Sequence, residues 1–203
     1  MPIDLLPRRQ LLISGAAAFA VAALGPLPAL ALTEAQARQL VDSAVADINR
    51  VIASGQSESA MMPEFERIFA TYADVPVMAR YALGADARSA SPGQLQAFTQ
   101  AFQQYIARKY GKRFRDFIGA QIVVNSARQI KNGYEVRGTA KLRGESPVEV
   151  VFLVSDRSGR NLFFNLFVEG VNLLLTERTE IGAMLDQQGG NIDNLIAALQ
   201  RAG

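Results

Sequence analysis

Three residue types are missing from the sequence: histidine, cysteine and tryptophan. Without histidine and cysteine the chain has no imidazole general base, no Ser-His-Asp or Cys-His nucleophile system, and no zinc site built on these residues. Disulfide bonds and iron–sulfur clusters are excluded as well. Lysine, tyrosine and carboxylate side chains remain available for catalysis, so the composition disfavours an enzyme without excluding one.

The length and the charge balance indicate one globular domain. The chain has 203 residues, of which 49% are hydrophobic and 20% are charged, as is typical of a folded protein. Its 21 lysines and arginines nearly balance 19 aspartates and glutamates, which leaves a net charge of +2. So weak a positive field does not point to a nucleic-acid partner.

The N-terminal segment has the layout of a bacterial export signal. Arginines at positions 8 and 9 precede an apolar stretch at 11–24, and Ala29 and Ala31 flank Leu30 at a cleavage site. The apolar run of about 14 residues is shorter than the roughly 20 that span a bilayer. We expect cleavage after Ala31, which leaves a mature domain at 32–203 in the periplasm. The segment RRQLL resembles a twin-arginine signal, with the general secretory (Sec) route as the alternative.

Helical periodicity and capping residues mark most of the mature chain. Capping boxes open at Thr33 (TEAQ) and Ser91 (SPGQ), and Asp74 is the expected N-cap of a helix that ends near Gly84. Further helices are expected at 64–72, from 171 to the glycine pair at 189–190, and at 193–199. The helix that begins at Ser91 is long and extends to about residue 117.

The hydrophobic period changes to two in the second half, which indicates strands. Extended segments are expected at 122–128, 134–142, 148–154 and from Asn161 onward, with a hairpin turn at KNG (131–133). Helices followed by an antiparallel four-stranded meander and further helices predict an α+β fold. The expected architecture is one domain with a curved sheet and a helical layer.

The fourth expected strand, within NLFFNLFVEGVNLLL (161–175), is unusually apolar. Strict alternation divides its residues into one face with Leu162, Phe164, Leu166 and Val168, and another with Phe163 and Phe167. The first face is either a covered core strand or the wall of a cavity for a ligand that is not protein. The same two interpretations apply to the aromatic residues of the helix that begins at Ser91, and composition alone favours core packing for both.

Five basic residues gather near the end of that helix: Arg108, Lys109, Lys112, Arg113 and Arg115. They form either a patch for lipid phosphate or an acidic partner, or a set of cations that interact favourably with a helix C-terminus on a solvated face. The second interpretation is favoured.

Two blocks of motifs run in a fixed order through the chain. The first block comprises ARYALG (79–84), A-S-P (90–92), phenylalanines at 98 and 102, and Tyr110. The second block comprises VEGVNL (168–173), Thr176, Arg178, and the ending with ID (192–193) and LI (195–196). In order and spacing they resemble the motifs of the MlaC family, the toluene-tolerance auxiliary proteins, over nearly all of the mature chain. The chain departs from these motifs at Ala87 and Asn161, where the family usually has tryptophan, and at Glu177, where tyrosine is common.

The resemblance implies both a fold and a function. It implies a cone similar to that of nuclear transport factors, in which helices and a curved sheet enclose a deep apolar pocket for acyl chains. It also implies a periplasmic phospholipid carrier with no catalytic activity, cofactor or metal. Such a carrier works between an outer-membrane lipoprotein complex and an inner-membrane ABC transporter with an MCE ring. We expect this chain to be a monomeric carrier of that kind.

An acyl chain in water costs about 0.8 kcal/mol for each exposed CH₂ group, so its pocket must be lined by apolar side chains. As a hypothesis, the pocket is lined by Tyr81, Phe98, Phe102, Ile106, Leu153, Phe164, Leu166, Val168 and Val171. Arg80 is either a contact to the lipid phosphate at the rim or a member of a structural ion pair.

Three alternatives stay open at this point. The cargo is another lipid, such as a hopanoid, as the departures from the family motifs allow. The protein is an exported hydrolase or isomerase, because the cone fold also occurs in enzymes. Or it is an exported structural protein whose core is fully packed.

Overall fold

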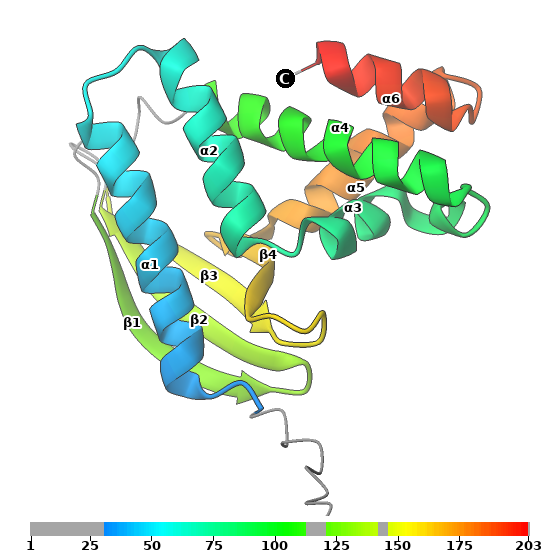
Figure 1. Cartoon of the computed structure of the whole chain (residues 1–203). Helices are drawn as coiled ribbons and strands as arrows, with labels where there is room; N and C mark the ends of the chain where they lie inside the picture. Colours follow the sequence, from blue (N-terminus) through cyan, green and yellow to red (C-terminus); the bar gives the residue numbers. More distant parts are fainter. Residues whose placement is uncertain (1–30, 113–120, 142–145, 203) are drawn as a thin grey trace, which may run out of the picture. The chain divides into compact units, whose positions relative to one another are not determined.

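The computed structural model describes residues 31–112, 121–141 and 146–202, which contain six α-helices and five strands (Figure 1). In chain order these are α1 (Glu34–Ala53), α2 (Glu58–Tyr72), α3 (Val75–Leu83), a 3₁₀ turn η1 (Gly84–Arg88), α4 (Pro92–Gly111), β1 (Gln121–Ile130), β2 (Gly133–Lys141), β3 (Val148–Ser155), β4 (Leu162–Val168), β5 (Val171–Asn172), α5 (Leu173–Gln187) and α6 (Ile192–Arg201). The expected α+β class is confirmed. The export signal and the end of the helix expected to reach residue 117 lie outside the described residues.

Side-chain caps fix the beginnings of three helices, as the sequence predicts. The hydroxyl of Thr33 accepts the amide of Gln36, whose own side chain accepts the amide of Thr33, and Ser91 and Gln94 repeat this capping box at α4. The carboxylate of Asp74 caps α3. These bonds satisfy amides that have no partner within their own helix.

Helix α2 begins six residues before the expected position 64 and includes Pro63 within its length. A proline inside a helix removes one amide donor, which is why the sequence favours a helix that begins after it. Here Ser57 caps the helix through the amide of Ala60, and the buried residues Met61 and Phe65 pack against α1. Packing therefore outweighs the lost hydrogen bond.

The five strands form one antiparallel sheet in the order β1-β2-β3-β4-β5. The fifth strand was not expected. The chain reverses at Glu169 and Gly170, which both have positive φ angles (48° and 78°), and two residues then pair with the end of β4. A reversal of this kind favours glycine at one of its positions.

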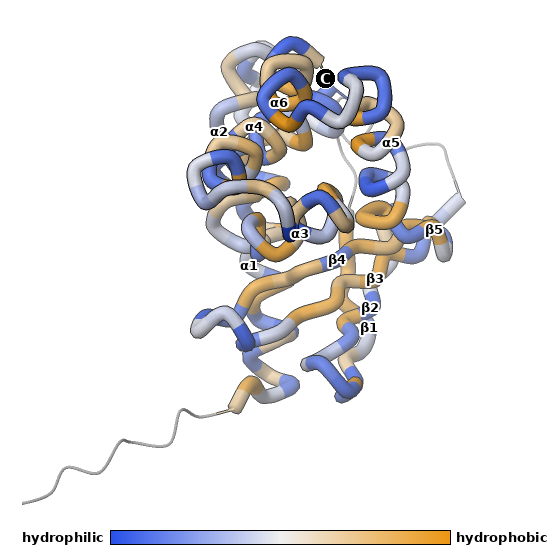
Figure 2. The backbone as a smooth tube through the Cα atoms, turned by 90° about the vertical axis from the view of Figure 1, so that its right-hand side faces the viewer, coloured by the Kyte–Doolittle hydropathy of each residue, from blue (hydrophilic) through white to orange (hydrophobic). Residues whose placement is uncertain are grey.

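One face of the sheet packs against α1. The core between them contains Val41 and Val45 of α1 and the strand residues Val136, Phe152 and Val154, all buried. Figure 2 shows that β3 and β4 are hydrophobic along most of their length. We call this cluster the α1–sheet core.

A second core lies among the helices. Phe98 and Phe102 of α4 are fully buried with Ile181 of α5 and with Leu195 and Leu199 of α6. We call this cluster the helical core. Among the residues that the structure describes, none of the helices combines the length and the hydrophobicity of a membrane span.

The alternation predicted for β4 is wrong at its beginning. Val154 pairs with Phe163 while Leu153 pairs with Asn165, so Phe164 is an extra residue that forms a β-bulge. The bulge brings Phe163 to the face of Leu166 and Val168, where all three pack on the α1–sheet core. A single-residue insertion leaves no mark in a run where every residue except Asn165 is apolar, so periodicity could not reveal it.

Candidate functional site

Phe163 connects the two cores. Its ring lies 5.7 Å from the ring of Phe152 in the sheet, edge to face, and 6.3 Å from that of Phe69 in α2. Its carbonyl accepts the amide of Asp74 at 2.8 Å, which fixes the start of α3 to β4. Since Phe163 packs against both the helical core and the α1–sheet core, its contacts mark an apolar boundary between them, which we call the seam.

Five residues of the predicted pocket lie in the two cores that meet at the seam. Phe98, Phe102 and Ile106 belong to the helical core, and Leu166 and Val168 pack on the α1–sheet core. Leu166 and Val168 lie near Phe163 along β4, whereas α4, which carries the other three, packs chiefly on α2, α3 and α6 and not on the sheet. The apolar side chains of both cores are of the kind that an acyl chain requires in its pocket.

The structure does not bring the other predicted residues to the seam. Leu153 lies on the opposite face of the sheet from Leu166, because it pairs with Asn165 and Glu135. Phe164 occupies the bulge, and Tyr81 and Val171 are exposed at the surface. One pocket cannot include both Leu153 and Leu166 without crossing the sheet.

Arg80 lies at an open hollow of about 380 Å³ between α3 and α4, which is also lined by Pro76, Leu95, Gln96, Thr99 and Gln100. Its guanidinium forms no ion pair with a carboxylate of the described residues. A second hollow of about 500 Å³ lies on α1 and is lined largely by polar side chains, Arg38 and Asp42 among them. Both hollows are open to solvent and most of their lining residues are polar or charged, so neither encloses an acyl chain.

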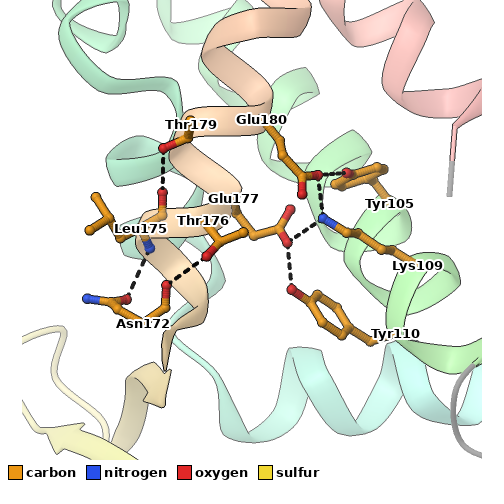
Figure 3. A network of polar contacts seen from close by, with 9 residues as sticks. All are labelled: Tyr105, Lys109, Tyr110, Asn172, Leu175, Thr176, Glu177, Thr179 and Glu180. Carbon is orange, nitrogen blue, oxygen red and sulfur yellow. Dashed lines mark hydrogen bonds and ion pairs between the residues drawn. The ribbon is translucent and has the colours of Figure 1, made fainter. Parts of the chain in front are cut away.

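A network of polar side chains joins α4 to α5 (Figure 3). Glu177 of α5 is almost fully buried, with 2% of its surface exposed. Its Oε1 accepts hydrogen bonds from the hydroxyl of Tyr110 at 2.6 Å and from the ammonium of Lys109 at 2.7 Å. The same ammonium donates to Glu180, which also accepts the hydroxyl of Tyr105.

The network fixes the ionisation of its members. Burial alone would lower the pKa of Lys109, but hydrogen bonds to Glu177 and Glu180 outweigh it, and the pKa lies above its usual value. Burial, followed by the hydrogen bond to Glu177, raises the pKa of Tyr110. The hydrogen bond from Lys109 lowers the pKa of Glu180. At neutral pH Lys109 and Glu180 are therefore charged and Tyr110 is neutral, so none of the three is poised to exchange a proton.

One atom of this network lacks a partner. Oε2 of Glu177 is buried and has no hydrogen bond within the described residues. Burial of an unsatisfied carboxylate oxygen is unfavourable. This desolvation penalty offsets part of the stability that the hydrogen bonds between α4 and α5 contribute. Nothing in the sequence pointed to this arrangement, because Tyr110 and Glu177 are 67 residues apart.

The structure assigns internal roles to two residues of the basic cluster. Arg108 donates to the carbonyls of Leu199 and Ala202 at 2.6 and 2.9 Å and so binds the C-terminal end of α6. Lys109 belongs to the network described above. Lys112 is exposed, and Arg113 and Arg115 lie outside the described residues. Neither interpretation of the cluster anticipated that its first two members point into the protein.

Clusters of three or more acidic, histidine or cysteine side chains able to hold a metal ion do not occur among the residues that the structure describes. The polar groups with shifted pKa values lie in ion pairs or hydrogen bonds between elements. These side chains therefore connect neighbouring helices and strands of the fold.

Comparison with known proteins gives the family. Residues 38–201 match the model of the MlaC protein family, and the chain belongs to that family. The fold is similar to that of the phospholipid-binding protein from Ralstonia solanacearum, solved in complex with a phospholipid. That match has a TM-score of 0.69 and 17% sequence identity, and it covers 81% of this chain and 95% of the other.

Proposed function

We propose that this protein is a periplasmic phospholipid carrier and not an enzyme. Membership of the MlaC family is the observation that carries the proposal. The similarity of fold to a protein solved with a bound phospholipid supports it. The apolar seam supports it as well, because the seam offers two hydrophobic walls without a polar recognition motif.

In this proposal the acyl chains enter between the two cores. Phe98, Phe102 and Ile106 form the helical wall, and Leu166 and Val168, with Phe163 beside them, form the sheet wall. The headgroup stays at the surface, where Arg80 is a candidate contact. Tyr81, Leu153, Phe164 and Val171 are not part of these walls as the structure stands, and would join them only after a rearrangement.

The carrier would serve an Mla-type ABC transport system as its mobile component. Its proposed partners are the inner-membrane transporter with its MCE ring and the outer-membrane lipoprotein complex. Transfer of a fluorescent phospholipid from labelled donor vesicles to unlabelled acceptors tests the carrier role. Recovery of the lipid chemically unchanged supports a carrier, whereas release of a fatty acid or headgroup would support a hydrolase.

The proposed export signal ends at Ala31, and one contact supports this position. The backbone nitrogen of Leu32 donates to Oδ2 of Asp156 at 2.9 Å, and the Leu32 side chain is buried against the α1–sheet core. After cleavage this nitrogen becomes a charged α-amino group, which strengthens its interaction with a carboxylate. N-terminal sequencing of the protein recovered from the periplasm tests the site, with Leu32 as the expected first residue.

A further inference from the structure

Large hydrophobic side chains are exposed at five positions of the described residues, and four of them lie on adjoining elements, namely α3 and the continuous segment of β5 and α5. Val77 and Tyr81 lie on α3, Val171 is in β5, and Leu175 is in the first turn of α5. The fifth, Val123, is on β1. Single exposed hydrophobic residues are common on proteins, but a group of them marks an interaction site.

The four residues form one surface because their elements adjoin. Val77 and Tyr81 are four residues apart on α3, and Leu175 and Arg178 are three apart on α5, so each pair shares a helix face. Helix α3 packs directly against α5. The guanidinium carbon of Arg178 lies 5.0 Å from the centre of the Tyr81 ring, which joins the two pairs. We call this set, with Val171 and Arg80, the α3/α5 surface.

Folding alone does not explain the residues of this surface. Helix α3 buries Met78, Ala79, Ala82 and Leu83 on its inner side. An outer helix face normally carries polar residues, yet here it presents Val77 and Tyr81 beside Arg80. Valine is also a weaker helix former than the polar residues usual at such positions.

The charges of the surface are mainly positive. Arg80 and Arg178 form no ion pair with a carboxylate of the described residues. The guanidinium of Arg178 lies beside Gly84, where an added Cβ would be in ordinary van der Waals contact with its Nη2 atom at 3.4 Å, so it is the positive φ of 70° that favours glycine at this position. Exposed carboxylates nearby in sequence are those of Glu169, in the turn before Val171, of Asp86 in η1, and of Glu180, which is paired with Lys109.

The shape of the surface favours a membrane over a protein segment. A bound helix needs an apolar groove and a bound strand needs a free sheet edge, whereas β5 has only two residues and four of the six side chains that line the hollow beside α3 are polar or charged. Protruding aliphatic side chains, a tyrosine and flanking arginines suit the interface of a bilayer that contains anionic lipids.

We propose that the α3/α5 surface docks the protein on an anionic phospholipid bilayer. Val77, Tyr81, Val171 and Leu175 enter the headgroup region, while Arg80 and Arg178 interact with lipid phosphates. The contact is weak and reversible, as a carrier that must leave the membrane requires. This proposal rests on the proposed carrier function, for which it supplies the place of contact with a membrane.

Binding of the exported protein to vesicles tests the proposal. Vesicles of equal parts phosphatidylglycerol and phosphatidylcholine are expected to bind the protein, and binding should weaken as salt is added. Pure phosphatidylcholine vesicles should bind much less. Replacement Arg178→Gln should lower affinity about fivefold, the effect of one arginine near an anionic surface. No binding of the wild type to the anionic vesicles, or equal binding to both kinds, would overturn the proposal.

A matched pair of variants tests the apolar contribution. Val77 and Leu175 are 47% and 49% exposed, and Val123, far from this surface in the sequence, is 48% exposed. The double substitution Val77→Ser and Leu175→Ser should abolish vesicle binding, and Val123→Ser should leave it unchanged. An equal loss in the Val123 variant would show that the surface has no special role.

The lipid content of the same samples separates the two proposals. Native mass spectrometry should find the same bound lipid in the wild type and in the Val77/Leu175 variant. Loss of that lipid in the variant would assign these residues to the cargo site and overturn the docking proposal. A wild type that is bare, and stays bare after incubation with phospholipid vesicles, would instead overturn the carrier function.

Discussion

Tyr110 donates its hydroxyl proton to Oε1 of Glu177 across 2.6 Å, and the same oxygen accepts the ammonium of Lys109. The acceptor lies on α5 and both donors lie on α4, so one buried carboxylate connects the two helices. The backbones of these helices approach each other at few points. Their connection in this region therefore depends on side chains.

Replacement Glu177→Ala should destabilise the protein by about 2–3 kcal/mol, because it leaves the partly buried hydroxyl of Tyr110 without its acceptor and removes one of the two carboxylates that bind the Lys109 ammonium. Urea unfolding followed by circular dichroism measures the change. Glu180→Ala is the control, since Glu180 has a 45% exposed side chain and its loss should cost less than about 1 kcal/mol. A larger loss in the Glu180 variant would contradict this account of the network.

The stability of the protein should depend on pH in the acid range through Glu135. Hydrogen bonds from Arg128, with a further one from Arg137, lower the pKa of Glu135 from 4.5 to about 2. A carboxylate with a lowered pKa in the folded state stabilises fully above its unfolded value, and this contribution is lost as pH falls through the folded value. Stability should therefore decrease from pH 4.5 down to about 2.

The unfolding free energy of the Glu135→Gln variant, measured between these pH values, isolates the contribution of the Glu135 carboxylate to stability. The slope of the unfolding free energy against pH should become shallower than in the wild type. A double variant, Arg128→Gln with Arg137→Gln, should show the same flattening, because it removes the hydrogen bonds that lower the pKa. An unchanged slope in both variants would show that Glu135 is not the source of this pH dependence.

The two faces of the sheet give a direct test of where lipid binds. Leu166 packs on the α1–sheet core and Leu153 lies on the opposite face, and both side chains are partly buried. Leu166→Asp should lose most of the bound lipid, because a charge on the apolar wall is not compensated. Leu153→Asp should retain it.

Circular dichroism must show that both variants fold, and the milder Leu166→Asn replaces Leu166→Asp if it does not. Lipid retained in a folded Leu166 variant and lost in the Leu153 variant would place the pocket on the other face of the sheet.

Cleavage after Ala31 predicts an ion pair between the new α-amino group of Leu32 and Asp156, whose atoms are 2.9 Å apart. Asp156→Asn should therefore destabilise the exported protein by about 1 kcal/mol at pH 6. The cost should shrink above about pH 8, where a free α-amino group loses its charge. Equal costs at both pH values would indicate that the chain is not cut at this position.

Much of the fold could be predicted from local signals. The capping boxes at Thr33 and Ser91 and the Asp74 cap locate three helices, because capping is a contact within four residues. The strand segments follow from period-two patterns and the turn at KNG. The bulge at Phe164 could not be predicted, because every residue around it except Asn165 is apolar and either register buries hydrophobic side chains.

The candidate site was harder to predict for a related reason. Phe98, Phe102 and Leu166 are apolar residues on helix and strand faces that periodicity identifies as inward-facing. Which of the two cores each residue joins depends on contacts between distant segments, and Phe163 was placed on the wrong face. Tyr81 was expected to line the pocket, but its ring lies at the surface beside the guanidinium of Arg178.

The proposed function requires that this protein carries a lipid. Native mass spectrometry of the protein purified from the periplasm of its own host, with lipid extraction of the same sample, tests it most directly. We predict a mass increment that matches a phospholipid recovered in the extract; a hopanoid or another lipid would keep the carrier and change its cargo. A protein that is bare, and stays bare after incubation with phospholipid vesicles, would contradict the account.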